Sequence, residues 1–470
     1  MLESLRPALV ITEREVRDQF RDWRIIFPVV ALTVIFPFLA NFAAAQMLNF
    51  VNQYGAGIIG ERLIPFLLMI VGFFPISVSL VMALETFVGE RERGSIEPLL
   101  NTPLKDWQLY LGKLLAATVP PVVASYLGMG VYLGGLLLQG IPWPEVNTLL
   151  QVLVLTAVQA LMMVSGAVVV SSQTTSVRAA NLLSSFIIIP AAFLIQGESI
   201  LMFWGTNDSL WYAVIGVVIL TILLVRVGLA RFQREELLGR DIDVLNLKWG
   251  WRVFKSQFSG GARTPWAWYA RSVGPTLRKL RIAILLALLI AVAGVWVGSL
   301  QIERFNIPLT ESSLEDIDQR VGQLLQMWPL FDFGPVLFIF WHNLRVLLLG
   351  LVLGLVSFSI LGMLPLFASM GVVGYLMALL MGNGLPVWNY AMFVIPHGIL
   401  EIPAVILATA AVLQSGAVLA APTPGKSIGQ IWLESLADWC KVMVGVVIPL
   451  LLIAAMIEAW LTPRIAVMFF

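Results

Sequence analysis

This sequence is poor in charge, cysteine and histidine. Only 12% of its 470 residues are charged, against about 25% in a typical soluble domain, and 59% are hydrophobic. A single cysteine, Cys440, excludes an internal disulfide framework. The net charge of +1 gives no sign of a nucleic-acid partner. The composition is that of an integral membrane protein, whose immediate partner is the lipid bilayer.

Long apolar runs make up most of the chain. A helix needs about 20 apolar residues to cross a bilayer. We therefore expect an all-α polytopic membrane protein with about 11 transmembrane helices, near residues 25–46, 63–83, 114–138, 148–170, 181–197, 210–229, 282–300, 336–356, 357–381, 390–413 and 441–461. Pro365 and several glycines leave open a second interpretation of 336–381, as one span plus a re-entrant piece.

The distribution of lysine and arginine predicts the orientation, because these residues are enriched in cytoplasmic loops. They gather in the N-terminal arm and in segments 84–113 and 226–281. The alternate loops hold only Arg62; these loops are 47–62, 139–147 and 197–209. We expect a cytoplasmic N-terminus, and a C-terminus on the opposite side if the ambiguous region makes two spans.

The N-terminal arm has the pattern of an amphipathic helix. Its apolar residues recur at helical spacing: Leu2, Leu5, Leu9, Val16, Phe20 and Trp23. Its other face is charged: Glu13, Arg14, Arg17, Asp18 and Arg21. This predicts an N-terminal interfacial helix at the cytoplasmic surface. An ordinary positively charged flank would explain the charge but not the apolar stripe.

The apolar pattern stops in the middle of the chain. There, "FSGGARTP" (258–265) supplies turn-forming residues, and the aromatic and basic residues that follow it are typical of an interfacial anchor. We expect a six-helix membrane domain at 1–230, a cytoplasmic linker and anchor at 231–281, and a second membrane domain at 282–470.

A compact charged segment, "GERERGSIEPLLNTP" (89–103), separates the second and third spans. Within "ETFVGERERGSIEPLLNTPLKDWQLYLGK" (85–113) it resembles the membrane subunits of type-2 ABC exporters, a resemblance that extends over roughly residues 1–230. In that family the segment is a coupling helix that docks on an ATPase. The resemblance assigns this role to Glu90, Arg91, Glu92, Arg93, Gly94, Ser95, Ile96, Glu97, Leu99 and Leu100. Pro98 departs from the family pattern.

The resemblance also implies partners and a location. It implies a separate cytoplasmic ABC ATPase subunit, a second permease half in a homodimer or heterodimer, and the bacterial cytoplasmic (inner) membrane. This chain has no phosphate-binding loop, because "APTPGKS" (421–427) has Ala420 where such a loop requires glycine. We therefore expect no catalytic residue, cofactor or metal in this chain, with ATP and Mg held by the ATPase.

The second half resembles a different family. "FVIPHGILEIPAVILATAAVLQSG" (393–416) and "FWHNLRVLLLGLVLG" (340–354) are similar to the stage II sporulation protein M family, over about residues 270–461. At the position of a later asparagine in that family, this chain has Met370. The resemblance implies a fold rather than an activity.

Polar residues interrupt the apolar runs of this half: His342, Asn343, Arg345, His397 and Glu401. Charged groups in the bilayer usually face the helix bundle and pair with one another. We therefore predict that Glu401 pairs with Arg345 or His397, with Asn343 completing the hydrogen bonds. The cluster either fixes helix packing or has a gating or signalling role.

Three functional classes follow. The first is the membrane (permease) subunit of an ATP-driven ABC transporter, coupling the ATPase to substrate export or envelope remodelling. The second is a scaffold that transmits ATPase motion to envelope enzymes without transport. The third, an intramembrane enzyme using His342, His397 and Glu401, is disfavoured because His-x-x-x-Glu is not the zincin pattern.

Overall fold

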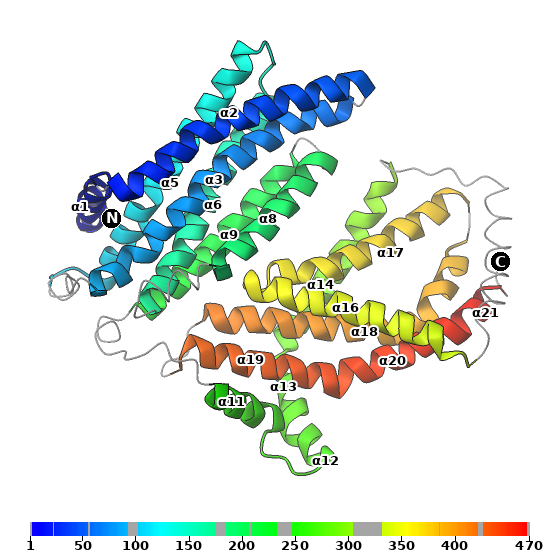
Figure 1. Cartoon of the computed structure of the whole chain (residues 1–470). Helices are drawn as coiled ribbons and strands as arrows, with labels where there is room; N and C mark the ends of the chain where they lie inside the picture. The colour runs from blue at the N-terminus through cyan, green and yellow to red at the C-terminus, as the bar shows by residue number, and fades with distance from the viewer. Residues whose placement is uncertain are drawn as a thin grey trace. The chain divides into compact units, whose positions relative to one another are not determined.

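The chain folds as two helical units (Figure 1). The computed structural model describes residues 2–21, 23–54, 57–92, 102–173, 185–205, 208–232, 247–303, 331–384, 386–421 and 426–467. Within these ranges there is no strand, which confirms the all-α prediction. The units are Met1–Leu245 and Asn246–Phe470. Their boundary falls inside the segment 231–281 that the sequence assigns to a linker.

The first unit is a bundle with a helix across one end (Figure 1). In chain order its helices are α1 (Leu2–Gln19), α2 (Trp23–Tyr54), α3 (Gly57–Glu92), α5 (Asp106–Leu138), α6 (Val146–Gln173), α8 (Ser185–Trp204) and α9 (Ser209–Arg231). α3 packs on α2, α5 and α6, and α9 packs on α6. The crossing helix, α1, packs on the start of α5.

The N-terminal helix predicted from the sequence is present as α1, and it has three faces. Ala8 is buried against α5. Leu9 and Phe20 are more than half exposed, and Glu13 is ion-paired with Arg17 one turn along at 2.9 Å. An apolar face that no part of the described unit covers, beside a charged face, fits a helix lying in the membrane interface.

The second unit contains more numerous and more interrupted helices. They are α11 (Leu247–Ser259), α12 (Pro265–Trp268), η1 (Tyr269–Val273), α13 (Gly274–Lys279), α14 (Arg281–Leu300), η2 (Gln301–Glu303), α16 (Phe333–Val356), η3 (Leu361–Met363), α17 (Leu364–Gly382), α18 (Val387–Ala420), α19 (Ile428–Val442), η4 (Met443–Val447), α20 (Ile448–Met456), η5 (Ile457–Leu461) and α21 (Thr462–Val467). α18 is the central helix and packs on α14, α16, α19, α20 and α21.

Length and hydropathy agree with the predicted spans. Within the described ranges, nine helices are long and apolar enough to cross a membrane. Two shorter apolar helices, Arg62–Ser77 and Ile187–Phe203, overlap the second and fifth predicted spans, 63–83 and 181–197. The ambiguous region 336–381 forms two separate helices, α16 and α17, each long enough to span.

Glycines bring α14 and α17 into backbone contact. A Cβ on Gly298 would lie 1.9 Å from the carbonyl oxygen of Gly371, and one on Gly374 would lie 2.0 Å from that of Val295. Gly294 and Gly298 are four residues apart, the spacing of small residues at close membrane-helix crossings. We call these four glycines the glycine seam.

A helix also occupies part of the segment expected to be a linker. α11 packs on α19, where Gln257 Nε2 donates to Asp438 Oδ1 at 2.8 Å. Phe254 and Phe258 stack at a centroid distance of 6.0 Å, and Trp268 donates its indole N–H to the Phe258 carbonyl. The segment from Leu247 onward is therefore part of the folded second unit.

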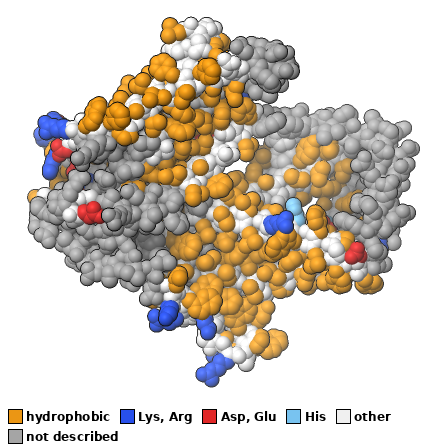
Figure 2. All heavy atoms as spheres, viewed as in Figure 1, with side chains coloured by type: hydrophobic (Ala, Val, Ile, Leu, Met, Phe, Trp, Pro, Cys, Tyr) orange, Lys and Arg blue, Asp and Glu red, His pale blue; other side chains and the backbone are white. Residues whose placement is uncertain are grey.

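Hydrophobic side chains cover most of the visible surface of the described residues (Figure 2). Large apolar residues of α2 illustrate this, with Phe38 63% and Phe42 65% exposed. A soluble domain rarely exposes such continuous apolar area. Each unit thus has the surface of a lipid-embedded bundle.

Candidate functional site

A fully buried lysine lies next to the segment expected to dock the ATPase. The ammonium nitrogen of Lys113 lies 2.9 Å from Glu90 Oε1 and 3.5 Å from Glu15 Oε1. The ring of Phe87 faces the same ammonium, with its centroid 5.2 Å away. We call Glu15, Phe87, Glu90 and Lys113 the Lys113 junction. Two carboxylates and an aromatic face around one buried cation provide the pairing that a buried charge requires.

The junction joins three helices: Glu15 belongs to α1, Glu90 to the last turn of α3, and Lys113 to α5. Close packing of α1 on α5 makes this possible. A Cβ on Gly112 would lie 2.9 Å from the Ala8 carbonyl oxygen, and Thr12 Oγ1 donates to the Gly112 carbonyl at 3.1 Å. Gly112 and Lys113 end the exporter-like motif. Gly112 lets α1 approach closely, and Lys113 pairs with Glu15 of that helix.

The end of α3 has further contacts with α6 and with the end of α9. Ser171 Oγ, on α6, accepts hydrogen bonds from the backbone N–H groups of Phe87 and Val88 at 3.1 and 3.2 Å. The Phe87 ring lies 5.2 Å from that of Phe232, just after α9. The last turn of α3 thus contacts most of the helices at this end of the unit.

Burial raises the pKa of Glu90, because the charged form loses hydration. The nearby Lys113 ammonium acts in the opposite direction. Desolvation is the larger effect, so the Glu90 carboxyl holds its proton to a higher pH than an exposed glutamate does.

Most residues of the predicted docking segment lie outside the described part of the chain. Glu90 belongs to the Lys113 junction, and Glu92, at the end of α3, is exposed. Arg91 belongs to α3, but its side chain is not among those that the structure describes. The others lie outside it altogether: Arg93, Gly94, Ser95, Ile96, Glu97, Leu99 and Leu100. Docking through them stays a prediction.

The chain is described again from Thr102, where it bends, and α5 begins at Asp106. The backbone N–H of Lys105 donates to Gln108 Oε1 at 3.0 Å, as in a capping box. Both ends of the undescribed segment therefore lead directly into helices of the Lys113 junction.

The second unit contains a polar cluster among its membrane helices. Asn343 Nδ2, on α16, donates to Glu401 Oε1 on α18 at 3.1 Å. His397 Nδ1 lies 3.2 Å from Thr462 Oγ1. Glu458, which the sequence analysis did not include, completes the group: one ligand atom each of His397, Glu401 and Glu458 lies within 4.8 Å of the others. We call these three residues the His-Glu-Glu cluster.

The other two residues predicted for this cluster lie elsewhere. His342 and Arg345 are exposed, and the guanidinium of Arg345 lies over the Trp341 ring, 5.4 Å from its centroid. Within the described residues Arg345 makes no ion pair with Glu401. Helical spacing explains the difference, because Asn343 is about 200° around α16 from Arg345.

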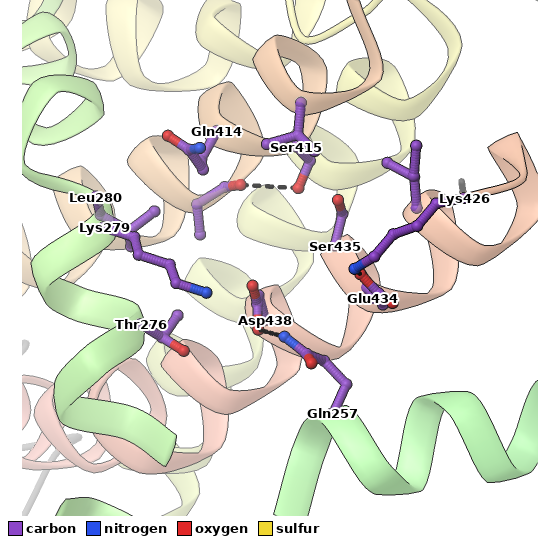
Figure 3. A pocket seen from close by; sticks show the side chains of 13 residues that line it. Gln257, Thr276, Lys279, Leu280, Gln414, Ser415, Lys426, Glu434, Ser435 and Asp438 are labelled. Carbon is purple, nitrogen blue, oxygen red and sulfur yellow. Dashed lines mark hydrogen bonds and ion pairs between the residues drawn. The ribbon is translucent and has the colours of Figure 1, made fainter. Parts of the chain in front are cut away.

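A polar pocket of about 150 Å³ lies between α11, α13, α18 and α19 (Figure 3). Lys426 Nζ donates to Glu434 Oε2 at 2.6 Å on one side. On the other side Asp438 accepts from Gln257, and the amino group of Lys279 points toward it. The pocket has room for a small polar group, and groups of both charges line it.

A further polar pair lies inside the first unit. Gln159 Nε2, on α6, donates to Glu198 Oε2 on α8 at 2.5 Å, and both residues are buried. The sequence analysis did not single out this pair. The predicted fifth span ends at residue 197, one residue before Glu198, whereas α8 continues to Trp204. The apolar run Ile187–Phe203, which includes Glu198, is the signal that could have identified the pair, because ionisable residues in membrane segments are uncommon and often functional.

These two bundles define a multi-pass membrane protein made of two different domains. Residues 9–209 match the family model described as ABC-2 family transporter protein, and residues 282–463 match the one described as Stage II sporulation protein M. The chain is a fusion of an ABC-2 transporter domain with a stage II sporulation protein M domain. Both resemblances predicted from the sequence are confirmed. A comparison with curated proteins gave no match.

Proposed function

We propose that this chain is the membrane subunit of an ATP-driven export complex in a bacterial cytoplasmic membrane. The ABC-2 family match over 9–209 supports a transporter subunit. In the proposal a separate cytoplasmic ATPase binds Glu97, Leu99 and Leu100, and a second permease half completes the pathway. The fused C-terminal domain moves with the transporter domain and carries its motion to the envelope.

The Lys113 junction is the observation that carries this proposal. The proposed docking segment lies between α3 and α5, and Glu90 and Lys113 join these two helices directly. Glu15 adds the interfacial helix α1 to the same ion-paired group. A displacement of the docking segment by an ATPase would therefore move three helices together. A surface loop with no mechanical role has no need of such an arrangement.

Release of the ATPase tests the proposal. The full chain is co-expressed with the ATPase that co-purifies from native membranes, and the complex is captured through the membrane subunit. Glu97→Arg, or Leu99→Ser with Leu100→Ser, should remove the ATPase while the membrane subunit keeps its thermal-unfolding midpoint. The matched control is Glu145→Arg in the loop 139–147, which should retain the ATPase. Retention by the docking variants would contradict the assignment.

The same capture distinguishes transport from scaffolding. Recovery of the ATPase with export components supports a permease, whereas stoichiometric recovery of a peptidoglycan hydrolase supports the transmission of motion without a cargo. The C-terminal domain makes this comparison necessary, because its family match lies entirely outside the transporter domain.

A further inference from the structure

The His-Glu-Glu cluster presents two carboxylates side by side within membrane-spanning helices. Glu401 and Glu458 are each partly buried. The ion pairs of the described residues do not include either glutamate. Two adjacent carboxylates in a poorly hydrated site repel one another, so a cation or a shared proton is needed. The cluster as a whole therefore needs positive charge.

The donor atoms favour a metal cation over a proton alone. An imidazole nitrogen with carboxylate oxygens suits zinc and similar divalent transition metals. Bonds of about 2 Å in a tetrahedral site place ligand atoms roughly 3.3 Å apart. The three ligand atoms already lie within 4.8 Å of one another, so small side-chain rotations close the remaining gap.

Neighbouring polar groups leave the ligand atoms available. With its proton on Nδ1, His397 donates to Thr462 Oγ1, and Nε2 then keeps its lone pair for a metal ion. Asn343 donates to Glu401 Oε1, which orients that carboxylate and leaves Oε2 for the metal ion. Metal-binding histidines and carboxylates are commonly oriented in this way by a second layer of hydrogen bonds.

The backbone brings Glu458 into the cluster. Glu458 lies in η5, a π-helical turn, and such turns are frequent at functional sites. Trp460 in the same turn donates its indole N–H to the Asp332 carbonyl at 3.0 Å. Buried Ala455 and Ala459 pack against Val336 of α16, the helix that carries Asn343. The turn is thus fixed to the helix that supplies the orienting amide.

We propose that His397, Glu401 and Glu458 bind one divalent transition-metal cation, with zinc as the best match to the donor set. The ion joins the central helix of the domain, α18, to the π-helical turn η5. Its remaining coordination position is open to water or to a carboxylate of a partner. The proposal rests on the C-terminal domain alone and stands independently of ATPase docking.

Metal analysis of the full chain tests the site. The protein is purified in detergent through a tag free of histidine, stripped with a chelator, and equilibrated with Zn²⁺. We expect one Zn²⁺ per chain and a higher thermal-unfolding midpoint than in the stripped protein. His397→Ala and Glu458→Gln should each reduce the bound metal to well below one equivalent. Asn343→Ala should weaken binding by about 10–100-fold, the usual effect of losing an orienting partner.

The chain offers matched controls. His342→Ala removes its only other histidine, and Glu434→Gln removes a carboxylate paired with Lys426 in the same unit; both should retain one equivalent. Cys440→Ser excludes binding through the lone thiol. Should the ligand variants fail to fold, Co²⁺ absorption of the wild-type protein, displaced by Zn²⁺, gives a test without variants. The proposal would be overturned if the wild-type protein bound no stoichiometric metal, or if His397→Ala bound as much metal as the wild type.

Discussion

The ammonium nitrogen of Lys113, on α5, lies 2.9 Å from Glu90 Oε1 on α3, and these are the two helices that flank the proposed docking segment. The lysine is fully buried, whereas the Glu90 side chain remains 23% exposed. A buried cation is tolerated only with close anionic partners, so this contact fixes how α3 and α5 meet.

Replacing Lys113 should destabilise the first unit. Lys113→Met keeps most of the volume but removes the ammonium that lies between the Glu15 and Glu90 carboxylates. We expect a loss of about 3 kcal/mol in the free energy of unfolding, the low end for breaking a buried pair, because both carboxylates are partly exposed. Chemical denaturation in detergent measures it. Lys105→Met, at an exposed lysine before α5, is the control and should change stability little.

The raised pKa of Glu90 predicts a pH dependence. The unfolded chain releases this proton near the ordinary glutamate pKa, while the folded chain still holds it. The unfolded state therefore binds fewer protons in this interval, and the contribution of Glu90 to stability falls as pH rises through the raised pKa. Glu90→Gln removes this titration. The difference in unfolding free energy, variant minus wild type, should increase with pH across the interval; a decrease would show that Lys113 outweighs desolvation.

The glycine seam should not tolerate even one added methyl group. Gly298→Ala places a Cβ 1.9 Å from the Gly371 carbonyl oxygen, so α14 and α17 must separate. Overpacking of this kind costs about 1–3 kcal/mol, and the thermal-unfolding midpoint should fall accordingly. Gly429→Ala in α19 is the control, since a Cβ there meets nothing within 4 Å. An unchanged midpoint for Gly298→Ala would mean that the helices are not in backbone contact.

The purified chain should hydrolyse no ATP. The segment 421–427 follows a helix rather than a strand, since α18 ends at Ala420. Its lysine and serine have structural partners: Lys426 pairs with Glu434, and Ser427 Oγ accepts from the backbone N–H of Gln430. Phosphate release by the purified polypeptide should equal the buffer blank. Hydrolysis that persists after removal of every co-purifying ATPase would refute the separate-subunit interpretation.

The spans could be predicted because each is a long apolar run that must be helical in lipid. The contacts between helices could not be predicted from the sequence. From the sequence, Lys113 could be recognised only as a cytoplasmic positive charge and as the last residue of the exporter-like motif, because its burial depends on α1 folding over Gly112. Residue Glu458 lies 57 positions after Glu401 in the sequence. No local spacing brings these two glutamates together.

The division of 336–381 also depended on tertiary structure. The chain turns at Phe358 and Ser359, which have φ values of 49° and 74° although neither is glycine. Ser359 Oγ accepts from the Gly416 N–H at 3.0 Å and donates to the Val412 carbonyl, so α18 stabilises this turn. A sequence signal for the turn is absent because the partners that stabilise it lie more than 50 residues away.

The two π-helical turns of the final span change the phase of the helix along its length. Each adds one residue to a turn, which rotates all later side chains by about 100° relative to an unbroken α-helix. α19 therefore packs on α11 and α18, α20 packs on α16 and α18, and α21 contacts α18 again. One membrane span thus presents successive faces to different neighbours. Deleting a single residue from η5 would restore α-helical geometry there and leave Thr462 in its present phase, because the deletion removes the residue that the wide turn absorbs. Winding η5 into a regular α-helix without a deletion would instead rotate Thr462 by about 100°, away from His397.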